Sequence, residues 1–168
     1  MTVDFKTEIV GIRDTVSLLR KTEPAVFKEF RSKAKFAVDP IVKDAQARLN
    51  KASSGKAAPL SGLVRPWGKK KGRIVPGWSQ QVAVKGVKVQ VRPSKTAFLT
   101  VTQRQIAPAV FDIAGRKKPN KLSRQLDMFA KASRTMWPAA ESKEDEVTRN
   151  LSVLVEFVNE KTNRKLRY

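Results

Sequence analysis

Neither cysteine nor histidine occurs in this chain of 168 residues. Without cysteine no disulfide framework can form, which excludes the small disulfide-stabilised domains of secreted proteins. The usual ligand sets for zinc and blue copper are missing too, and so are the Ser-His-Asp and Cys-His triads. The sequence therefore predicts no metal site and no cofactor.

Acidic residues are scarce, and they are scarcest in the middle of the chain. There are 35 Lys and Arg against 15 Asp and Glu, a net charge of +20. Residues 61–124 contain 15 basic residues and a single acid, Asp112, whereas residues 1–60 and 125–168 carry net charges of only +5 and +1. Charge does not determine the fold, but this excess predicts that the middle of the chain lies close to a polyanion.

Long hydrophobic runs are absent as well. Acids at Asp4, Glu8 and Asp14 interrupt every apolar stretch near the N-terminus, which is not typical of a signal peptide. No stretch approaches the ~20 apolar residues that a membrane helix needs. We therefore expect a protein that is made and used in a cytoplasm, or built into a particle there, with no membrane partner.

Helical periodicity is present at both ends of the chain. One apolar stripe is expected to begin at Phe5 and end at Leu19, and a second, which starts near Thr22 and Pro24, reaches Leu49. Pro40 lies inside the second stripe and is expected to kink or split that helix. A third helix is predicted from Ser142 to about Leu166; acids near Ser142 and cations at the other end fit the helix dipole.

The middle of the chain favours strands. Residues 87–93 alternate valine with polar side chains, residues 97–103 follow after a turn-like linker, and a hairpin is predicted. Residues 108–115 and 79–86 are further strand candidates, and a short helix is expected at 122–132. Residues 52–78 lack periodicity and carry glycines and prolines that make a regular element improbable. We expect one α+β domain, with long N-terminal helices (1–51) and a C-terminal helix (142–168) packed on a mainly antiparallel sheet of three or four strands (79–115). The long basic loop (52–78) and a second basic loop with a short helix (116–141) complete the predicted domain.

Catalytic patterns are weak. Ser53 and Lys56 have the spacing of a serine–lysine pair but lack its companion motifs, and the same segment lacks the glycine spacing of a phosphate loop. The acids near residue 144 are explained by helix capping, and Asp112 is best interpreted as a salt-bridged residue on a strand. The sequence therefore does not indicate an enzyme or a small-molecule substrate.

The basic middle offers the better functional lead. Two cationic runs flank the predicted strands, and we expect them to contact a polyanion or DNA without base readout: Arg65, Lys69, Lys70, Lys71, Arg73, Arg116, Lys117 and Lys118. Trp67 and Trp78 flank the first run. They are able to stack on bases, but we favour a role as anchors on a neighbouring subunit.

The order of motifs in the C-terminal third resembles the tail-completion family of long-tailed bacteriophages. APAVFDIAGRKK (107–118) and SRTMWPAAE (133–141) precede a long amphipathic helix, as in that family of tail-terminator, tail-to-head joining and minor tail proteins. Phe111, Asp112 and Gly115 stand at one family motif, and Trp137 and Pro138 at the other, with a structural role. We expect Trp137 to be buried ahead of a helix start, with Pro138 ending the preceding segment. The chain departs from the commoner pattern, because alanine precedes Gly115 and tryptophan stands where phenylalanine is frequent.

The resemblance implies a subunit of a ring, usually sixfold, between the head connector or stopper and the tail tube, with double-stranded DNA passing through it. The implied location is the head–tail junction of a virion assembled in the bacterial cytoplasm. A ring needs heterologous contacts between subunits, which the long basic loop is able to supply. A free-standing nonspecific nucleic-acid-binding protein and a neighbouring neck component, such as a head-completion stopper, remain alternatives.

Overall fold

The computed structural model describes residues 20–21, 23–54, 61–66, 68–70, 72–75, 77–91, 99–114, 124, 126–127 and 130–166. The fold is α+β, as expected, and its elements follow one another in this order: α2 (Pro24–Ala37), α3 (Asp39–Ser54), α4 (Ser61–Val64), β1 (Lys69–Lys70), β2 (Arg73–Ile74), α5 (Gln80–Gly86), β3 (Val87–Val91), β4 (Leu99–Gln103), α6 (Ile106–Ile113), α8 (Met136–Ser142) and α9 (Glu144–Leu166). The helix expected between Phe5 and Leu19 lies outside the described residues.

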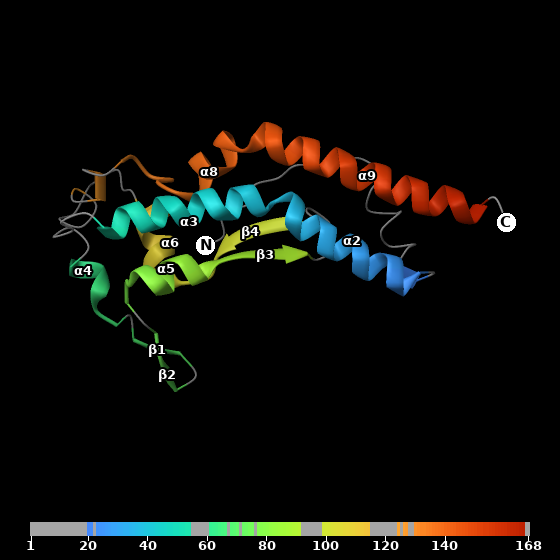
Figure 1. Ribbon diagram of the computed structural model, residues 1–168. Helices are drawn as coiled ribbons and strands as arrows, with labels where there is room; N and C mark the ends of the chain where they lie inside the picture. Colours follow the sequence, from blue (N-terminus) through green and yellow to red (C-terminus); the bar gives the residue numbers. More distant parts are fainter. Residues whose placement is uncertain are drawn as a thin grey trace.

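The long N-terminal stripe forms two helices, as Pro40 predicts. α2 ends at Ala37, and α3 begins at Asp39 with Pro40 in its first turn, where the missing N–H leaves no hydrogen bond unmade. The stripe is buried on both sides of the break, from Phe30 in α2 to Leu49 in α3. The two helices have different neighbours: α2 lies beside α9, and α3 contacts α8 and α5 (Figure 1).

The predicted central hairpin is confirmed. β3 and β4 pair antiparallel with Val89 opposite Val101, and the valines at both ends of β3 are buried. A hydrogen bond from Gln90 Nε2 to Thr102 Oγ1 (3.1 Å) joins neighbouring positions of the two strands. The linker between the strands lies outside the described residues.

Two predicted strands are helices instead. Residues 80–86 form α5, whose start is capped by Ser79: its Oγ accepts a hydrogen bond from the amide of Val82 (3.2 Å). Residues 106–113 form α6, with Pro108 in the first turn, where proline is tolerated. The described residues therefore contain two separate two-stranded ladders, β1–β2 and β3–β4, and not one sheet of three or four strands.

The C-terminal helix is confirmed, with a different start. α9 buries Val147, Leu151, Leu154 and Val158 along one stripe, and its first turn holds three acids. Ser142 does not cap α9, because it is the last residue of α8.

Trp137 is also placed differently from its expected buried position ahead of a helix. It lies within the first turn of α8, 43 % exposed, and its indole donates to Glu141 Oε1 one turn further along (2.7 Å). Pro138 lies in the same turn and does not end the preceding segment. The buried side chain at the start of α8 is that of Met136.

The core lies where the helices cover the β3–β4 hairpin. Asn150 of α9 donates to the carbonyl oxygen of Ala37 (3.3 Å), and Lys33 of α2 lies 4.6 Å from the centre of the Phe157 ring, so α2 and α9 run antiparallel. Within the short helix expected at 122–132, Leu126 is fully buried, while Leu122 and Phe129 lie outside the described residues. No helix in the described part of the chain has the length and apolar character of a membrane span.

Candidate nucleic-acid interface and its anchorage

The predicted basic loop contains a regular element, which we call the cationic hairpin (residues 65–74). β1 and β2 pair antiparallel, with Lys70 opposite Arg73, and the amide of Val75 donates to the carbonyl oxygen of Gly68 (2.8 Å). Gly68 and Gly72 have φ angles of 105° and 75°, values that other residues rarely adopt. The glycines in this segment made a regular element improbable from the sequence, but Gly68 and Gly72 in fact permit the hairpin to form.

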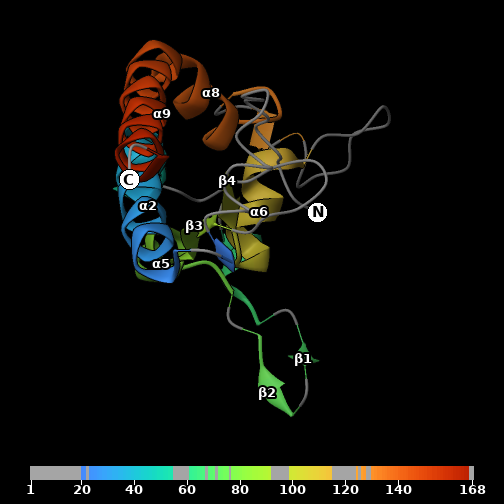
Figure 2. The same cartoon turned by 90° about the vertical axis from the view of Figure 1, so that its right-hand side faces the viewer.

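The cationic hairpin projects from the body of the molecule, and both views show it reaching away from the helices (Figures 1 and 2). Arg65, Lys69 and Arg73 are exposed, and none of the ion pairs within the described residues includes them. Residues 61–78 contain no acid in the sequence. These cations are therefore available to an external anion.

The base of the cationic hairpin is fixed to the core by Trp78. The amide of Trp78 donates to the carbonyl oxygen of Leu63 (2.7 Å), and its ring centre lies 4.9 Å from that of Phe111. Trp78 is 6 % exposed, so our expectation that it anchors a neighbouring subunit is wrong: its indole is part of this chain's own core. Trp67 lies outside the described residues.

Gly77 closes the same base. A Cβ at this position would lie 2.0 Å from the carbonyl oxygen of Val64, so only glycine fits beside that backbone. The contact joins the two ends of the segment that carries the hairpin. The hairpin is therefore held at its base by backbone contacts and by one buried aromatic side chain.

The structure brings some of the predicted cations together. Arg65, Lys69, Lys70 and Arg73 belong to the cationic hairpin, whereas Lys71, Arg116, Lys117 and Lys118 lie outside the described residues. A second group of exposed cations, which the sequence analysis did not single out, lies near the start of β3: Lys85, Lys88 and Arg104. The amide of Arg104 donates to the carbonyl oxygen of Gly86 (2.9 Å), which brings its backbone next to that of Lys85.

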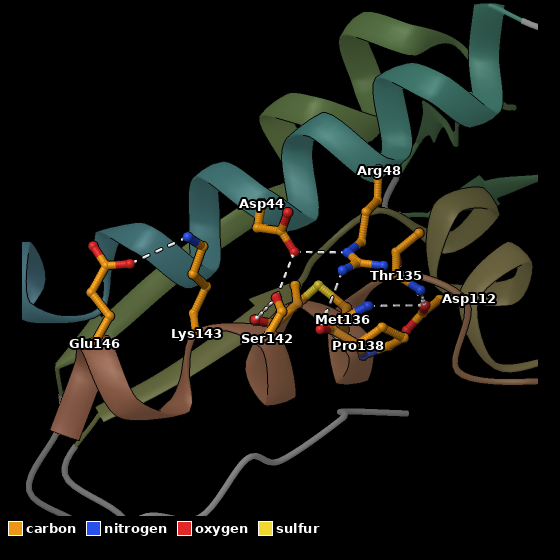
Figure 3. A network of polar contacts seen from close by, with 10 residues as sticks. Asp44, Arg48, Asp112, Thr135, Met136, Pro138, Ser142, Lys143 and Glu146 are labelled. Atoms are coloured by element: carbon orange, nitrogen blue, oxygen red, sulfur yellow. Dashed lines mark hydrogen bonds and ion pairs between the residues drawn. The ribbon is translucent and has the colours of Figure 1, made fainter.

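The two segments that carry the family resemblance meet in space at what we call the α6–α8 junction. Asp112, at the end of α6, is 1 % exposed, and its Oδ1 accepts hydrogen bonds from the amides of Thr135 and Met136 and from the Thr135 hydroxyl (2.6 Å) (Figure 3). The carboxylate therefore caps α8 from a distant part of the chain. Asp112 has the structural role expected, but on a helix, and as a cap in place of a salt bridge.

Arg134 makes the reciprocal contacts at the α6–α8 junction. Its buried guanidinium donates to the carbonyl oxygens of Phe111 and Ala114 (both 2.9 Å) and of Leu126 (3.1 Å), and to Asp127 Oδ1 (2.9 Å). Burial lowers the pKa of Arg134, and the charges of Asp127 and Asp112 oppose that shift. Arg134 thus satisfies carbonyls at the end of α6, while Asp112 satisfies amides at the start of α8.

At the α6–α8 junction the described motif residues make contacts that hold the fold together. Phe111 packs on Trp78, Asp112 caps α8, and Trp137 and Pro138 lie in the first turn of α8; Gly115 lies outside the described residues. Sequence reasoning missed Arg134. The signal that points to such a partner is the isolation of Asp112, the single acid in residues 61–124.

A second polar contact fastens α3 to α8. Arg48 donates to Asp44 Oδ2 (2.7 Å) and to the carbonyl oxygen of Pro138 (3.4 Å), and Ser142 donates to the same Asp44 oxygen (3.0 Å) (Figure 3). Burial tends to raise the pKa of Asp44, but hydrogen bonds from Arg48 and Ser142 and the charges of Arg48 and Lys143 outweigh it, and the pKa is lowered.

No protein-family model, curated protein or solved structure matches this chain. Within the described ranges no group of three or more carboxylates is placed to hold a metal ion. Among the described features, the cationic hairpin is the one whose exposed charges are best placed to bind another molecule.

Proposed function

We propose that this protein is a bacteriophage virion subunit at the head–tail junction. In this proposal copies of the chain form a ring that completes the tail and joins it to the head connector around the DNA channel. The observation that carries it is the cationic hairpin: a projecting, acid-free element with exposed cations, attached to an α+β body. The motif order of residues 107–141 supports the choice of family, and the exposed cations of the hairpin support a contact with DNA.

The chemistry of the cationic hairpin suits DNA that has to move. Exposed Arg and Lys neutralise phosphates and release counterions whatever the base sequence. A ladder with two residues in each strand offers no helix or extended ribbon for the major groove, so base edges would not be read. Contacts of this kind hold a duplex near the centre of a ring and still permit it to slide.

The attachment of the hairpin to the core also fits an element that has to withstand force. Trp78 at the hairpin base packs on Phe111, and the carbonyl oxygen of Phe111 accepts a hydrogen bond from the buried Arg134. A force on the hairpin would therefore pass through Trp78 into the buried core around Phe111. A hairpin at the wall of a channel through which a genome passes needs such support.

The electrostatic part of the proposal is tested with two variants of equal net charge. One neutralises the hairpin cations: Arg65→Ala, Lys69→Ala, Lys70→Ala and Arg73→Ala. Its matched control neutralises exposed cations of α2 and α9: Lys28→Ala, Arg31→Ala, Lys35→Ala and Arg149→Ala. For duplex DNA binding measured against salt concentration, we expect the hairpin variant to lose up to about 3.6 from the log–log slope and the control to lose much less. Equal losses would show that only net charge matters.

The assembly part is tested by imaging. Electron microscopy of the purified protein, or of virions labelled on this chain, is expected to show a ring at the neck with the cationic hairpins on the channel side. A strictly monomeric protein that is absent from particles would contradict the proposal. A ring on the connector side of the neck would instead identify a head-completion stopper.

A nonspecific nucleic-acid-binding protein is the second candidate, because the same exposed hairpin favours it. The two candidates differ in assembly: a free-standing binder would bind DNA with the same salt dependence as a monomer, away from virions. Sedimentation of the DNA complex separates them, because a ring carries several chains for each short duplex.

A further inference from the structure

The exposed cations near the start of β3 come from three different segments. Lys85 lies in the last turn of α5, Lys88 is the second residue of β3, and Arg104 follows β4 directly. We infer that this group, which we call the α5–β3 cluster, is a second phosphate-contact site for duplex DNA. The inference rests on the proposed function, because it extends the DNA contact from the cationic hairpin to the body of the protein.

Two of the three cations share one face of the β3–β4 ladder. Lys88 lies opposite Thr102, and the hydrogen bond from the Arg104 amide to the carbonyl oxygen of Gly86 (2.9 Å) continues the same register beyond β4. Side chains two residues apart in a strand point to the same face, so Arg104 lies diagonally across from Lys88, at a spacing of about 7–8 Å. The side chain of Val87 points to the opposite face and is part of the core. The two cations therefore face away from the core.

The surrounding sequence offers the cluster no carboxylate to pair with. The single acid in residues 61–124 is Asp112, which is buried and accepts hydrogen bonds from amides at the start of α8. Other exposed lysines do have partners, as Lys43 has in Asp39 (2.8 Å), but no ion pair in the described part of the chain includes a cation of the cluster. Its charge is therefore open to an external anion, and a row of phosphates binds such cations with release of counterions.

The position of Lys85 is not explained by the end of α5. Cations in a last helical turn often bond the free carbonyl oxygens there. At this helix end side-chain amides bond two of them. Gln103 donates to the carbonyl oxygen of Ala83 (2.9 Å), and Gln46 of α3 donates to that of Val84 (3.2 Å). The ammonium group of Lys85 is therefore left for another partner.

The backbone that carries the cluster is held in place by Gln103. Its Oε1 accepts a hydrogen bond from the amide of Gln105 (3.0 Å), while its Nε2 bonds the end of α5. A Cβ at Gly86 would lie 1.8 Å from the same Oε1, so the Gln103 side chain packs directly against this glycine. The ends of α5 and β4 are thus fastened together. Cations on such a support bind a phosphate backbone without the cost of ordering a loop.

The cluster and the cationic hairpin are close enough to contact one turn of DNA. Trp78 fixes the base of the hairpin, α5 begins two residues later, and its seven residues cover about 10 Å. Both views place the hairpin on the α5 side of the body, away from α9 (Figures 1 and 2). Because one turn of B-DNA is about 34 Å long, a single duplex is able to reach both groups.

Lysine acetylation tests the cluster without any substitution. The full chain is treated with an acetylating reagent, with and without a duplex of about 20 base pairs, or two turns, and the modified lysines are located by mass spectrometry. We expect the duplex to lower the acetylation of Lys85 and Lys88 by at least about threefold and to leave Lys28 and Lys35 of α2 nearly unchanged. Equal protection of the α2 lysines would overturn the inference, because binding would then follow net charge alone.

The same experiment separates the inference from the proposed function. Protection of Lys69 in the cationic hairpin without protection of Lys85 and Lys88 would overturn the inference and leave the proposed function in place. Protection of the cluster without protection of Lys69 would support the inference and contradict the role of the hairpin. Protection at none of these positions would contradict both.

A variant without the cluster gives an independent readout. It carries Lys85→Ala, Lys88→Ala and Arg104→Ala, and its matched control of equal net charge carries Lys28→Ala, Arg31→Ala and Arg149→Ala. For duplex DNA binding measured against salt concentration, we expect the cluster variant to lose up to about 2.7 from the log–log slope and the control to lose much less. Thermal unfolding of both variants checks that they are folded. Equal slopes for the two variants would overturn the inference.

Discussion

The cationic hairpin and the α6–α8 junction hold charge in opposite ways. The hairpin carries Lys69 and Arg73 in water on a short backbone ladder, where no carboxylate is near in sequence. The junction holds Asp112 and Arg134 away from water, where each satisfies the backbone ends of a helix. Trp78 and Phe111 lie between the two regions and join them through one aromatic contact.

This difference distinguishes the charges that stabilise the fold from those that are available for binding. A buried charge that loses its partners destabilises the protein strongly, whereas an exposed cation contributes little to stability and much to interaction with a polyanion. Substitutions at the α6–α8 junction should therefore change mainly the free energy of unfolding, whereas substitutions in the cationic hairpin should change mainly DNA binding. The following changes test that separation.

The largest effect is expected at Asp112. Asp112→Ala removes the acceptor of two buried amides and one hydroxyl, and we expect it to lower the free energy of unfolding by about 3 kcal/mol in chemical denaturation. Asp112→Asn keeps one acceptor oxygen and should fall between the variant and the wild type. Asp145→Ala, at an exposed acid in the first turn of α9, is the control and should cost less than about 1 kcal/mol. A wild-type unfolding midpoint for Asp112→Ala would show that the cap is not needed.

A smaller effect is expected at the base of the cationic hairpin. Gly77→Ala places a Cβ against the backbone of Val64, and the required shift should cost about 2 kcal/mol, measured by thermal unfolding. Gly72→Ala is the comparison, because its Cβ meets open space and only its positive φ is strained. That cost of about 1 kcal/mol falls on the hairpin and leaves the core intact. If both variants unfold alike, the hairpin base is not part of the cooperative core.

Removal of the four hairpin cations should leave the fold almost unchanged. The quadruple alanine variant proposed above lowers the net charge of +20 by four, and its free energy of unfolding should stay within about 0.5 kcal/mol of the wild type. Any change should be a slight gain at low salt, where self-repulsion is strongest. A loss of several kcal/mol in denaturation experiments would mean that the hairpin cations are structural.

The smallest effect concerns pH and Asp44. Its pKa in the folded protein is lowered from the usual 3.8, so its stabilising contribution is complete above that value and is lost as the pH falls. Between about pH 5 and about pH 3, Asp44→Asn should therefore show a slightly shallower loss of stability than the wild type. Because the side chain is partly exposed, the difference should be roughly a few tenths of a kcal/mol. A steeper loss in the variant would contradict the assignment.

Strongly periodic parts of the sequence predicted their structure well. The alternating valines of β3 and the stripe of α9 each match one period only, and Pro40 marks the break between α2 and α3. The strand predicted at residues 108–115 was wrong, because a short, nearly continuous apolar run has no period that separates a buried strand from a buried helix such as α6. At residues 79–86 the Ser79 cap was present in the sequence, but the alternation of Val82 and Val84 suggested a strand.

The candidate site could be predicted only in part. The uneven distribution of charge identified the basic segment, because net charge can be counted from the sequence alone. It did not reveal the β1–β2 ladder, which depends on the positive φ angles of Gly68 and Gly72. Trp78 was assigned to an interface because a tryptophan beside a lysine run offers no sign of the core that lies next to it. The pairing of Asp112 with Thr135, and of Arg134 with Phe111, depends on contacts across more than twenty residues, which composition and spacing do not encode.

The break at Val38 gives α2 and α3 different main packing partners. On one side of the break α2 packs mainly on α9, and on the other α3 packs mainly on α8 and α5, while both helices also contact β3. A change of the backbone angle at Val38 would therefore move α2 relative to α3 and would have to be absorbed where both helices pack on β3.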